Sequence, residues 1–164
     1  MVTQTPAQKA DSIIELLTSR GESDYIGEPI SQLAHSLQAA HFAASSGEAD
    51  EQTIVAALLH DIGQFLPASE AVRLAGSAAA GDMKDEASAK TPRQGNVDSG
   101  SVGRAGHEVI GQRYLAQLGF QPKVCSLVGA HVTAKRYLCA TETGYHETLS
   151  EAMVCRNVSA TEMG

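Results

Sequence analysis

The sequence predicts an all-α fold, and three observations support this prediction. Apolar residues recur at helical spacing along most of the chain, and no segment alternates apolar and polar residues as a half-buried strand does. Glycine, proline and aspartate stand at positions that are typical of helix ends. The 164 residues are 43% hydrophobic, which is enough for one domain to bury a core of its own.

Two helices are expected in the first part of the chain. The first covers 7–19, because apolar residues between Ile13 and Leu17 form one face, and it ends before Gly21, which suits a helix C-terminus. The second is expected to start at Pro29, since proline sacrifices no hydrogen bond in a first helical turn, and to continue to about Ser45.

Three more helices are expected further along. Asp50 is predicted to cap a helix whose run at 54–59 is apolar on all sides, which indicates a buried central element. Another helix is predicted to follow Gly106 and to end at Gly119, and the next to begin at Pro122.

Two segments depart from this pattern. We expect a flexible insertion over 65–105, because 75–106 is more than half Gly, Ala and Ser and such long loops are uncommon in compact domains. A short helix is predicted within it at 82–89. Residues 140–164 are polar and weakly patterned, as in an atypical or truncated C-terminal region. The prediction is therefore one domain over 1–164, interrupted by the insertion.

Composition excludes several classes of function. The net charge is −7 and only 4% of residues are aromatic, which disfavours nucleic-acid binding because phosphates are repelled and stacking surfaces are scarce. No stretch is apolar enough to span a membrane, and the N-terminal residues lack the apolar core of a signal peptide. Three cysteines without a CxxC motif indicate reduced thiols. We expect a cytoplasmic protein without nucleic-acid or membrane partners.

Histidines are the strongest chemical signal. The adjacent pair His60-Asp61 follows the buried apolar run, and imidazole with carboxylate suits iron, manganese or zinc. The two oxygens of Asp61 can bridge two metal ions. His41 and His146 are interpreted as ordinary histidines without such a role. Four histidines lie on or beside the apolar faces of predicted helices: His35, His60, His107 and His131.

Three further polar residues are candidates for a site. Lys135 follows His131 by four residues, so both lie on one helix face and the lysine can hold a phosphate or phosphonate oxygen. Tyr25 and Glu28 are the residues with chemical reach in the loop 22–28. The alternative interpretations are a solvated surface lysine and residues that pack a helix entry. No Walker, GxGxxG or GxSxG motif is present.

Together these residues resemble the HD-domain superfamily of metal-dependent phosphohydrolases and oxygenases. More closely, the chain resembles the mixed-valent diiron oxygenases of that superfamily, which cleave 1-hydroxyphosphonates. The resemblance covers about residues 10–140 apart from the insertion. The motifs are YIGEPISQL at 25–33, HS at 35–36, LLHDIGQ at 58–64, GHEVIG at 106–111 and HVTAKRYL at 131–138.

The resemblance implies an all-helical fold around an Fe(II)/Fe(III) pair, with O2 as co-substrate. It implies that Asp61 bridges the two ions. The other ligands that it implies are His35 and His60 for one iron, and His107 and His131 for the other.

The resemblance also implies how substrate is held. Lys135 would bind the phosphonate group, Tyr25 and Glu28 would form a mobile loop that leaves the site when substrate binds, and Gln64 would contact the substrate. The substrate implied is a 1-hydroxy-2-(amino or trimethylammonio)ethylphosphonate, and a glutamine at position 64 favours the trimethylammonio compound. Cleavage of its C–P bond, a step of phosphonate catabolism, releases phosphate with glycine or glycine betaine.

One departure from the family affects the metal site. The family has an aspartate ligand on a C-terminal helix, whereas this sequence has no aspartate after Asp98. We therefore expect one iron site to be incomplete or ligated by solvent. Two alternatives to the oxygenase are an HD-type metal-dependent phosphohydrolase and a degenerate HD domain that binds without catalysis.

Overall fold

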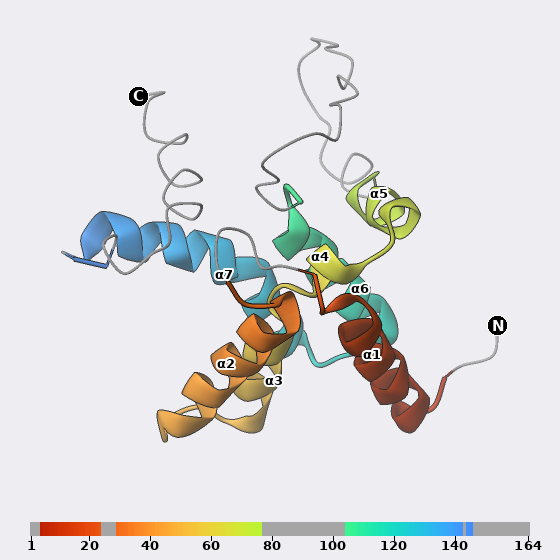
Figure 1. The fold of residues 1–164 in the computed structure, drawn as a ribbon, viewed down its shortest axis with the longest axis horizontal. Coiled ribbons are helices and arrows are strands. Elements are labelled where there is room, and N and C mark those ends of the chain that lie inside the picture. Colours follow the sequence, from red (N-terminus) through yellow and green to blue (C-terminus); the bar gives the residue numbers. More distant parts are fainter. Residues whose placement is uncertain (1–3, 24–28, 77–103, 143, 146–164) are drawn as a thin grey trace, which may run out of the picture.

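The computed structural model describes residues 4–23, 29–76, 104–142 and 144–145. Over these ranges all regular elements longer than one residue are helices, which confirms the predicted all-α fold (Figure 1). The helices are α1 (Pro6–Arg20), α2 (Gln32–Ser45), α3 (Glu51–Leu59), α4 (Ile62–Phe65), α5 (Ala68–Gly76), α6 (His107–Leu118) and α7 (Pro122–Thr141).

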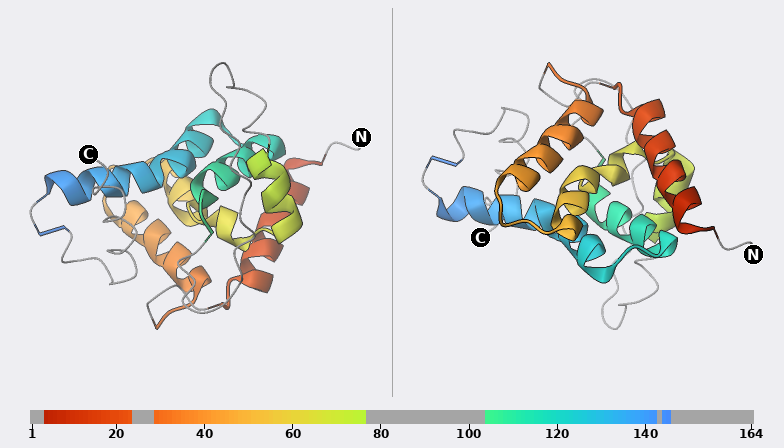
Figure 2. Two further views of the ribbon diagram at one scale, coloured as in Figure 1. Left: turned by 90° about the horizontal axis from the view of Figure 1, so that it is seen from above. Right: turned by 90° about the horizontal axis from the view of Figure 1, so that it is seen from below.

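The packing places α3 and α4 at the centre. Helix α3 lies between α2 and α7, while α4 packs on α6, and α6 packs along α7 (Figure 2). Burial of apolar surface, at roughly 25 cal/mol per Å², drives this arrangement. The turn between α3 and α4 is consequently fixed in the interior. The largest fully buried apolar side chains are Leu59, Ile62, Leu66, Leu74, Leu115 and Val128.

Several predicted helix ends are confirmed. The Asp50 carboxylate accepts a hydrogen bond from the Thr53 backbone N–H at 3.0 Å, which caps α3. Gly119 ends α6 with a φ of 79°, a left-handed conformation that favours glycine. The predicted start of α2 at Pro29 is wrong, because the Ser31 hydroxyl accepts from the Ala34 N–H at 3.1 Å and caps the helix there.

The predicted start of the insertion at residue 65 is also wrong. The chain stays helical through α5, and α5 is amphipathic, with Ala71 and Leu74 buried against Ile110 of α6. The small-residue bias that motivated the prediction begins only at about residue 75, after α5 has completed its packing. Residues 77–103 of the predicted insertion, including the short helix at 82–89, lie outside the described residues. Residues 146–164 also lie outside them, and α7 extends to Thr141.

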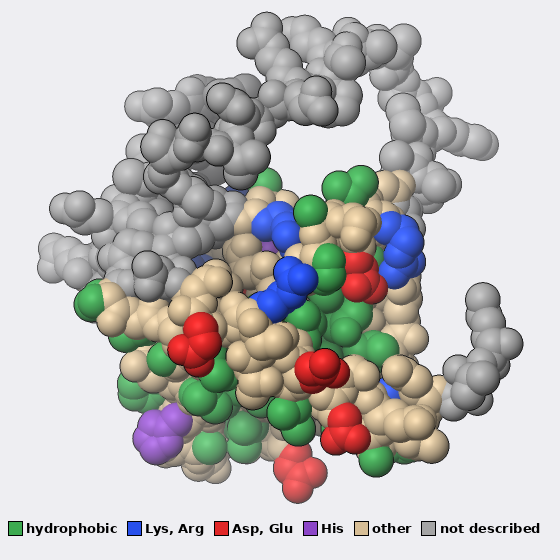
Figure 3. Space-filling model, turned by 45° about the vertical axis from the view of Figure 1, so that its right-hand side comes forward, with side chains coloured by type: hydrophobic (Ala, Val, Ile, Leu, Met, Phe, Trp, Pro, Cys, Tyr) green, Lys and Arg blue, Asp and Glu red, His purple; other side chains and the backbone are tan. Residues whose placement is uncertain are grey.

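The surface offers no evidence for a membrane-spanning element. In the part of the chain that the structure describes, none of the helices has the length and apolarity needed to cross a bilayer. Acidic and basic side chains are interspersed over the face shown in Figure 3.

Candidate metal centre

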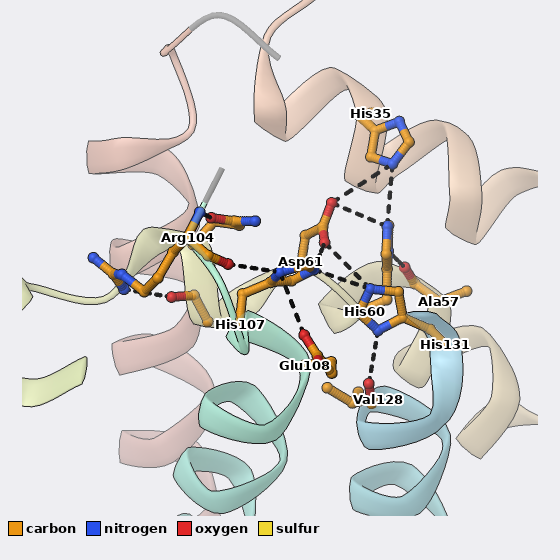
Figure 4. Close-up of polar contacts among 11 residues, drawn as sticks. His35, Ala57, His60, Asp61, Arg104, His107, Glu108, Val128 and His131 are labelled. Carbon is orange, nitrogen blue, oxygen red and sulfur yellow. Dashed lines mark hydrogen bonds and ion pairs between the residues drawn. The ribbon is translucent and has the colours of Figure 1, made fainter. Parts of the chain in front are cut away.

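Five side chains predicted as ligands come together near the centre of the fold (Figure 4). His35 lies in α2 and His131 in α7. His60 and Asp61 form the turn between α3 and α4, and His107 is the first residue of α6. Residues distant in sequence therefore meet because α2, α4, α6 and α7 surround that turn.

Asp61 lies between two pairs of histidines. Its Oδ2 atom is 3.2 Å from Nε2 of His60 and 3.8 Å from Nε2 of His35. Its Oδ1 atom is 3.0 Å from Nε2 of His107 and 3.5 Å from Nε2 of His131. Within each pair the two Nε2 atoms are 3.1 Å apart. Each carboxylate oxygen thus belongs to its own group of three potential ligand atoms, as a bridge between two metal ions requires. The first group is formed by His35, His60 and Asp61, and the second by Asp61, His107 and His131.

Backbone carbonyls orient three of these imidazoles. The Nδ1 atoms of His60 and His131 lie 2.7 Å from the carbonyl oxygens of Ala57 and Val128, each one helical turn earlier. The Nδ1 atom of His107 lies 3.0 Å from the carbonyl oxygen of Arg104. A carbonyl only accepts, so Nδ1 holds the proton of each neutral ring and the Nε2 lone pair points at Asp61.

This arrangement fits metal ions. In the second group the lone pairs of His107 and His131 face each other at 3.1 Å, with an Asp61 oxygen beside them. Three acceptors in contact repel one another unless a cation lies among them. Histidine ligands that donate their other N–H to a carbonyl are typical of metal sites, because that bond fixes the ring orientation.

The electrostatics favour the ligating protonation states of Asp61 and His35. Burial alone would raise the pKa of Asp61, but the imidazoles of His107, His131 and His60, each a hydrogen-bond donor to Asp61 whenever its Nε2 carries a proton, hold that pKa well below its usual range. Burial and the neighbouring His60 lower the pKa of His35 to about 4. Burial opposes protonation of His60 as well, but the Asp61 carboxylate outweighs it and raises that pKa. At neutral pH Asp61 is therefore an anion and His35 a neutral ring.

Gly63 allows the two halves of the site to approach. A Cβ atom on Gly63 would overlap the carbonyl oxygen of His107, and it would lie 3.0 Å from the backbone nitrogen of Gly111. Glycine at 63 therefore lets α4 contact α6 through backbone atoms, which places His107 beside Asp61. This role of Gly63 was not predicted from the sequence, although a glycine two residues after Asp61 in a buried run can indicate a close backbone contact.

Lys135 lies close to the first group. It is half-buried on α7 one turn after His131, and its positive charge contributes to lowering the pKa of His35. Its neighbour Arg136 is exposed. The Oε1 atom of Gln64 accepts a hydrogen bond from the backbone N–H of Arg104 at 2.7 Å.

The remaining sequence predictions divide between the described and the undescribed parts of the chain. Tyr25, Glu28 and His146 lie outside the described residues, so their predicted roles stay predictions. His41 is exposed on α2, as an ordinary surface histidine would be.

A helical domain with a His-Asp pair between two central helices, and with further histidines from surrounding helices, defines the HD class of proteins. The comparison with known families agrees: the HD domain profile matches residues 33–157. The chain belongs to the HD domain family.

Three curated relatives indicate which HD domain proteins this chain is similar to. The chain is 36% identical over 151 residues to a hydroxymethylphosphonate dioxygenase of Gimesia maris. It is 37% identical over 135 residues to a [1-hydroxy-2-(trimethylamino)ethyl]phosphonate dioxygenase (glycine-betaine-forming) of Leisingera caerulea. It is 34% identical over 145 residues to an uncharacterized protein of Acanthamoeba polyphaga mimivirus. The match to the Gimesia protein covers 92% of this chain, and the match to the Leisingera protein covers 82%. The match to the mimivirus protein covers 88%.

The chain spans 55 to 62% of the length of these relatives. The similarity confirms the predicted resemblance to HD-domain phosphonate dioxygenases.

Proposed function

We propose that this chain is an iron-dependent oxygenase that uses O2 to cleave the C–P bond of a small 1-hydroxyphosphonate. The observation that most supports the proposal is the position of Asp61, whose two oxygens each face a separate pair of histidine Nε2 atoms. Such a carboxylate suits two metal ions held side by side. The names of two relatives supply the reaction class.

The donor atoms and the proposed reaction with O2 together favour a redox-active metal at this position. Nitrogen and carboxylate ligands accept iron, manganese or zinc, and O2 chemistry excludes zinc because zinc has no redox states to offer. A mixed-valent iron pair bound here would supply the electron transfer that lets O2 attack a C–H bond. Each group offers three protein ligand atoms among the described residues, so we propose that solvent completes at least one iron site.

The overall reaction balances without a further reductant. A compound R–CH(OH)–PO3H2 reacts with O2 to give R–COOH and H3PO4. The C–H and C–P bonds of C1 break, and one oxygen atom enters each product. The carbon is oxidised, while O2 accepts the four electrons.

Four residues of the chain are proposed to bind and orient the substrate. We propose that Lys135 holds the phosphonate, because this half-buried residue is near enough for its charge to lower the pKa of His35, and phosphonate oxygens are strong acceptors. Tyr25 and Glu28 are proposed to form a mobile loop that occupies the site until substrate binds, and Gln64 to contact the substituent on C2. Glutamine favours the trimethylammonio substrate, whose product is glycine betaine, over the 2-amino substrate, whose product is glycine.

The test measures phosphate release by iron-loaded protein with and without O2. The substrates are hydroxymethylphosphonate and the 2-amino and 2-trimethylammonio derivatives of 1-hydroxyethylphosphonate. We expect release that requires O2, loss of release in His35→Ala, and normal release in His41→Ala, which removes an exposed histidine from the same helix. Absence of release from all three compounds would overturn the proposal. Phosphate release from phosphoesters without O2 would indicate a phosphohydrolase instead.

A further inference from the structure

Arg104 fastens the N-terminus of α6 to α4. Its guanidinium donates to the carbonyl oxygens of Gly63 at 2.5 Å and Leu66 at 2.9 Å. Its backbone N–H donates to the Gln64 side chain at 2.7 Å. Three hydrogen bonds from one half-buried residue thus bind the segment before α6 to the short helix that follows Asp61.

The same residue orients His107. Its carbonyl oxygen accepts from Nδ1–H of His107 at 3.0 Å. His60 and His131 take their Nδ1 partners from within their own helices, at Ala57 and Val128. The partner of His107 instead precedes α6, where the backbone N–H of His107 donates to it at 3.3 Å. The guanidinium contacts with α4 anchor the residue that carries this carbonyl.

We infer that Arg104 is a positioning residue for the metal group formed by Asp61, His107 and His131. It acts through His107 and touches neither metal nor substrate. The inference rests on the proposed metal centre. Losing the hydrogen-bond partner of a ligating histidine typically weakens metal binding 10- to 100-fold, and this is the upper bound for a substitution that keeps the Arg104 carbonyl but removes the guanidinium that anchors it. The group of His35 and His60 should be unaffected, because Arg104 orients neither ring.

Arg113 provides a matched control. Its guanidinium also binds carbonyl oxygens at a helix end, those of Leu74 at 2.6 Å and Ala75 at 3.3 Å in α5. It has no hydrogen bond to a residue of the metal centre among those that the structure describes. Arg113→Met therefore reproduces the loss of a helix-end contact without changing the support of His107.

The experiment measures binding of Co²⁺, followed by its visible absorption, in two single-group backgrounds. His35→Ala keeps the second group, and His107→Ala keeps the first. In the His35→Ala background we expect Arg104→Met to weaken Co²⁺ binding by up to about 10- to 100-fold and to alter the absorption bands. We expect Arg104→Met to change nothing in the His107→Ala background, and Arg113→Met to change affinity in neither. Arg104→Lys, which can reach one of the two carbonyls, should restore part of the affinity.

The outcomes separate this inference from the proposed function. Equal Co²⁺ affinities for Arg104→Met and Arg113→Met in the His35→Ala background would overturn the role of Arg104 and leave the metal centre intact. An equal loss in both backgrounds would also overturn it, because a general loosening of the fold would then explain the effect. Failure of the unmodified chain to bind Co²⁺ would reject the metal centre and the inference together.

Discussion

Replacing Gly63 by alanine tests the contact on which the geometry of the metal centre depends. The added methyl group would overlap the His107 carbonyl oxygen and lie 3.0 Å from the Gly111 nitrogen, where ordinary contacts begin near 3.4 Å. Both obstacles are backbone atoms, so α4 and α6 must separate. Overpacking of this kind costs about 1–3 kcal/mol, and we expect a value near the upper end. For a chain of this size that lowers the melting temperature by roughly 6–12 °C.

Gly76→Ala is the control for this change. A Cβ atom on Gly76, at the end of α5, would meet nothing within 4 Å, so the variant should be neutral or more stable by about 0.4–1 kcal/mol. Urea unfolding gives the two free energies of unfolding, and Co²⁺ titration shows whether the displaced His107 still binds. If Gly63→Ala unfolds at the same urea concentration as Gly76→Ala and binds Co²⁺ as the unmodified chain does, the close backbone contact is refuted.

Three further predictions follow from the site and the core. Asp61→Asn removes the charge shared by both groups, so metal content per chain, measured by elemental analysis after desalting, should fall well below that of the unmodified chain; an unchanged metal content would contradict the bridge. Hydrogen bonds from Lys123 and Thr53 lower the pKa of Asp50 to about 2. Lys123→Met should raise this pKa back towards 3.8, as measured by NMR titration. Because the folded pKa lies below the unfolded value, this stabilisation is present above pH 3.8 and lost as pH falls to 2, so urea midpoints of the variant should change less over that interval. Leu115→Ala should lower the free energy of unfolding by about 2–5 kcal/mol, since Leu115 is fully buried, and a loss below 1 kcal/mol in urea would show that the core repacks there.

The sequence predicted the fold class because helices depend on local patterns, and the resemblance to a known family supplied the candidate ligands, which the structure brings together. The cap at Asp50 and the apolar run at 54–59 specify a buried helix without reference to other elements. The His60-Asp61 pair is a short motif that needs no long-range information. Its partners were found from motifs in separate helices, and the structure brings them within ligand distance of one another.

The predictions from sequence failed where contacts between segments that are distant in the chain determine the structure. Helix α5 was included in the insertion because the small-residue composition of 75–106 was extended back to residue 65, whereas the helix packs against Ile110 in α6. Nothing local distinguishes Arg104 from a surface arginine, since its partners are carbonyls more than thirty residues away. The role of Gly63 likewise becomes visible only when α4 and α6 are placed together.

The anchoring by Arg104 and Arg113 also bears on how the chain tolerates changes of length. The segment 77–103 leaves from the end of α5, which Arg113 ties to α6, and returns at Arg104, which is tied to α4. Because both anchors hold residues of the described helices, a change in the number of residues between them would act on two fixed points and not directly on the distances between Asp61 and its histidines.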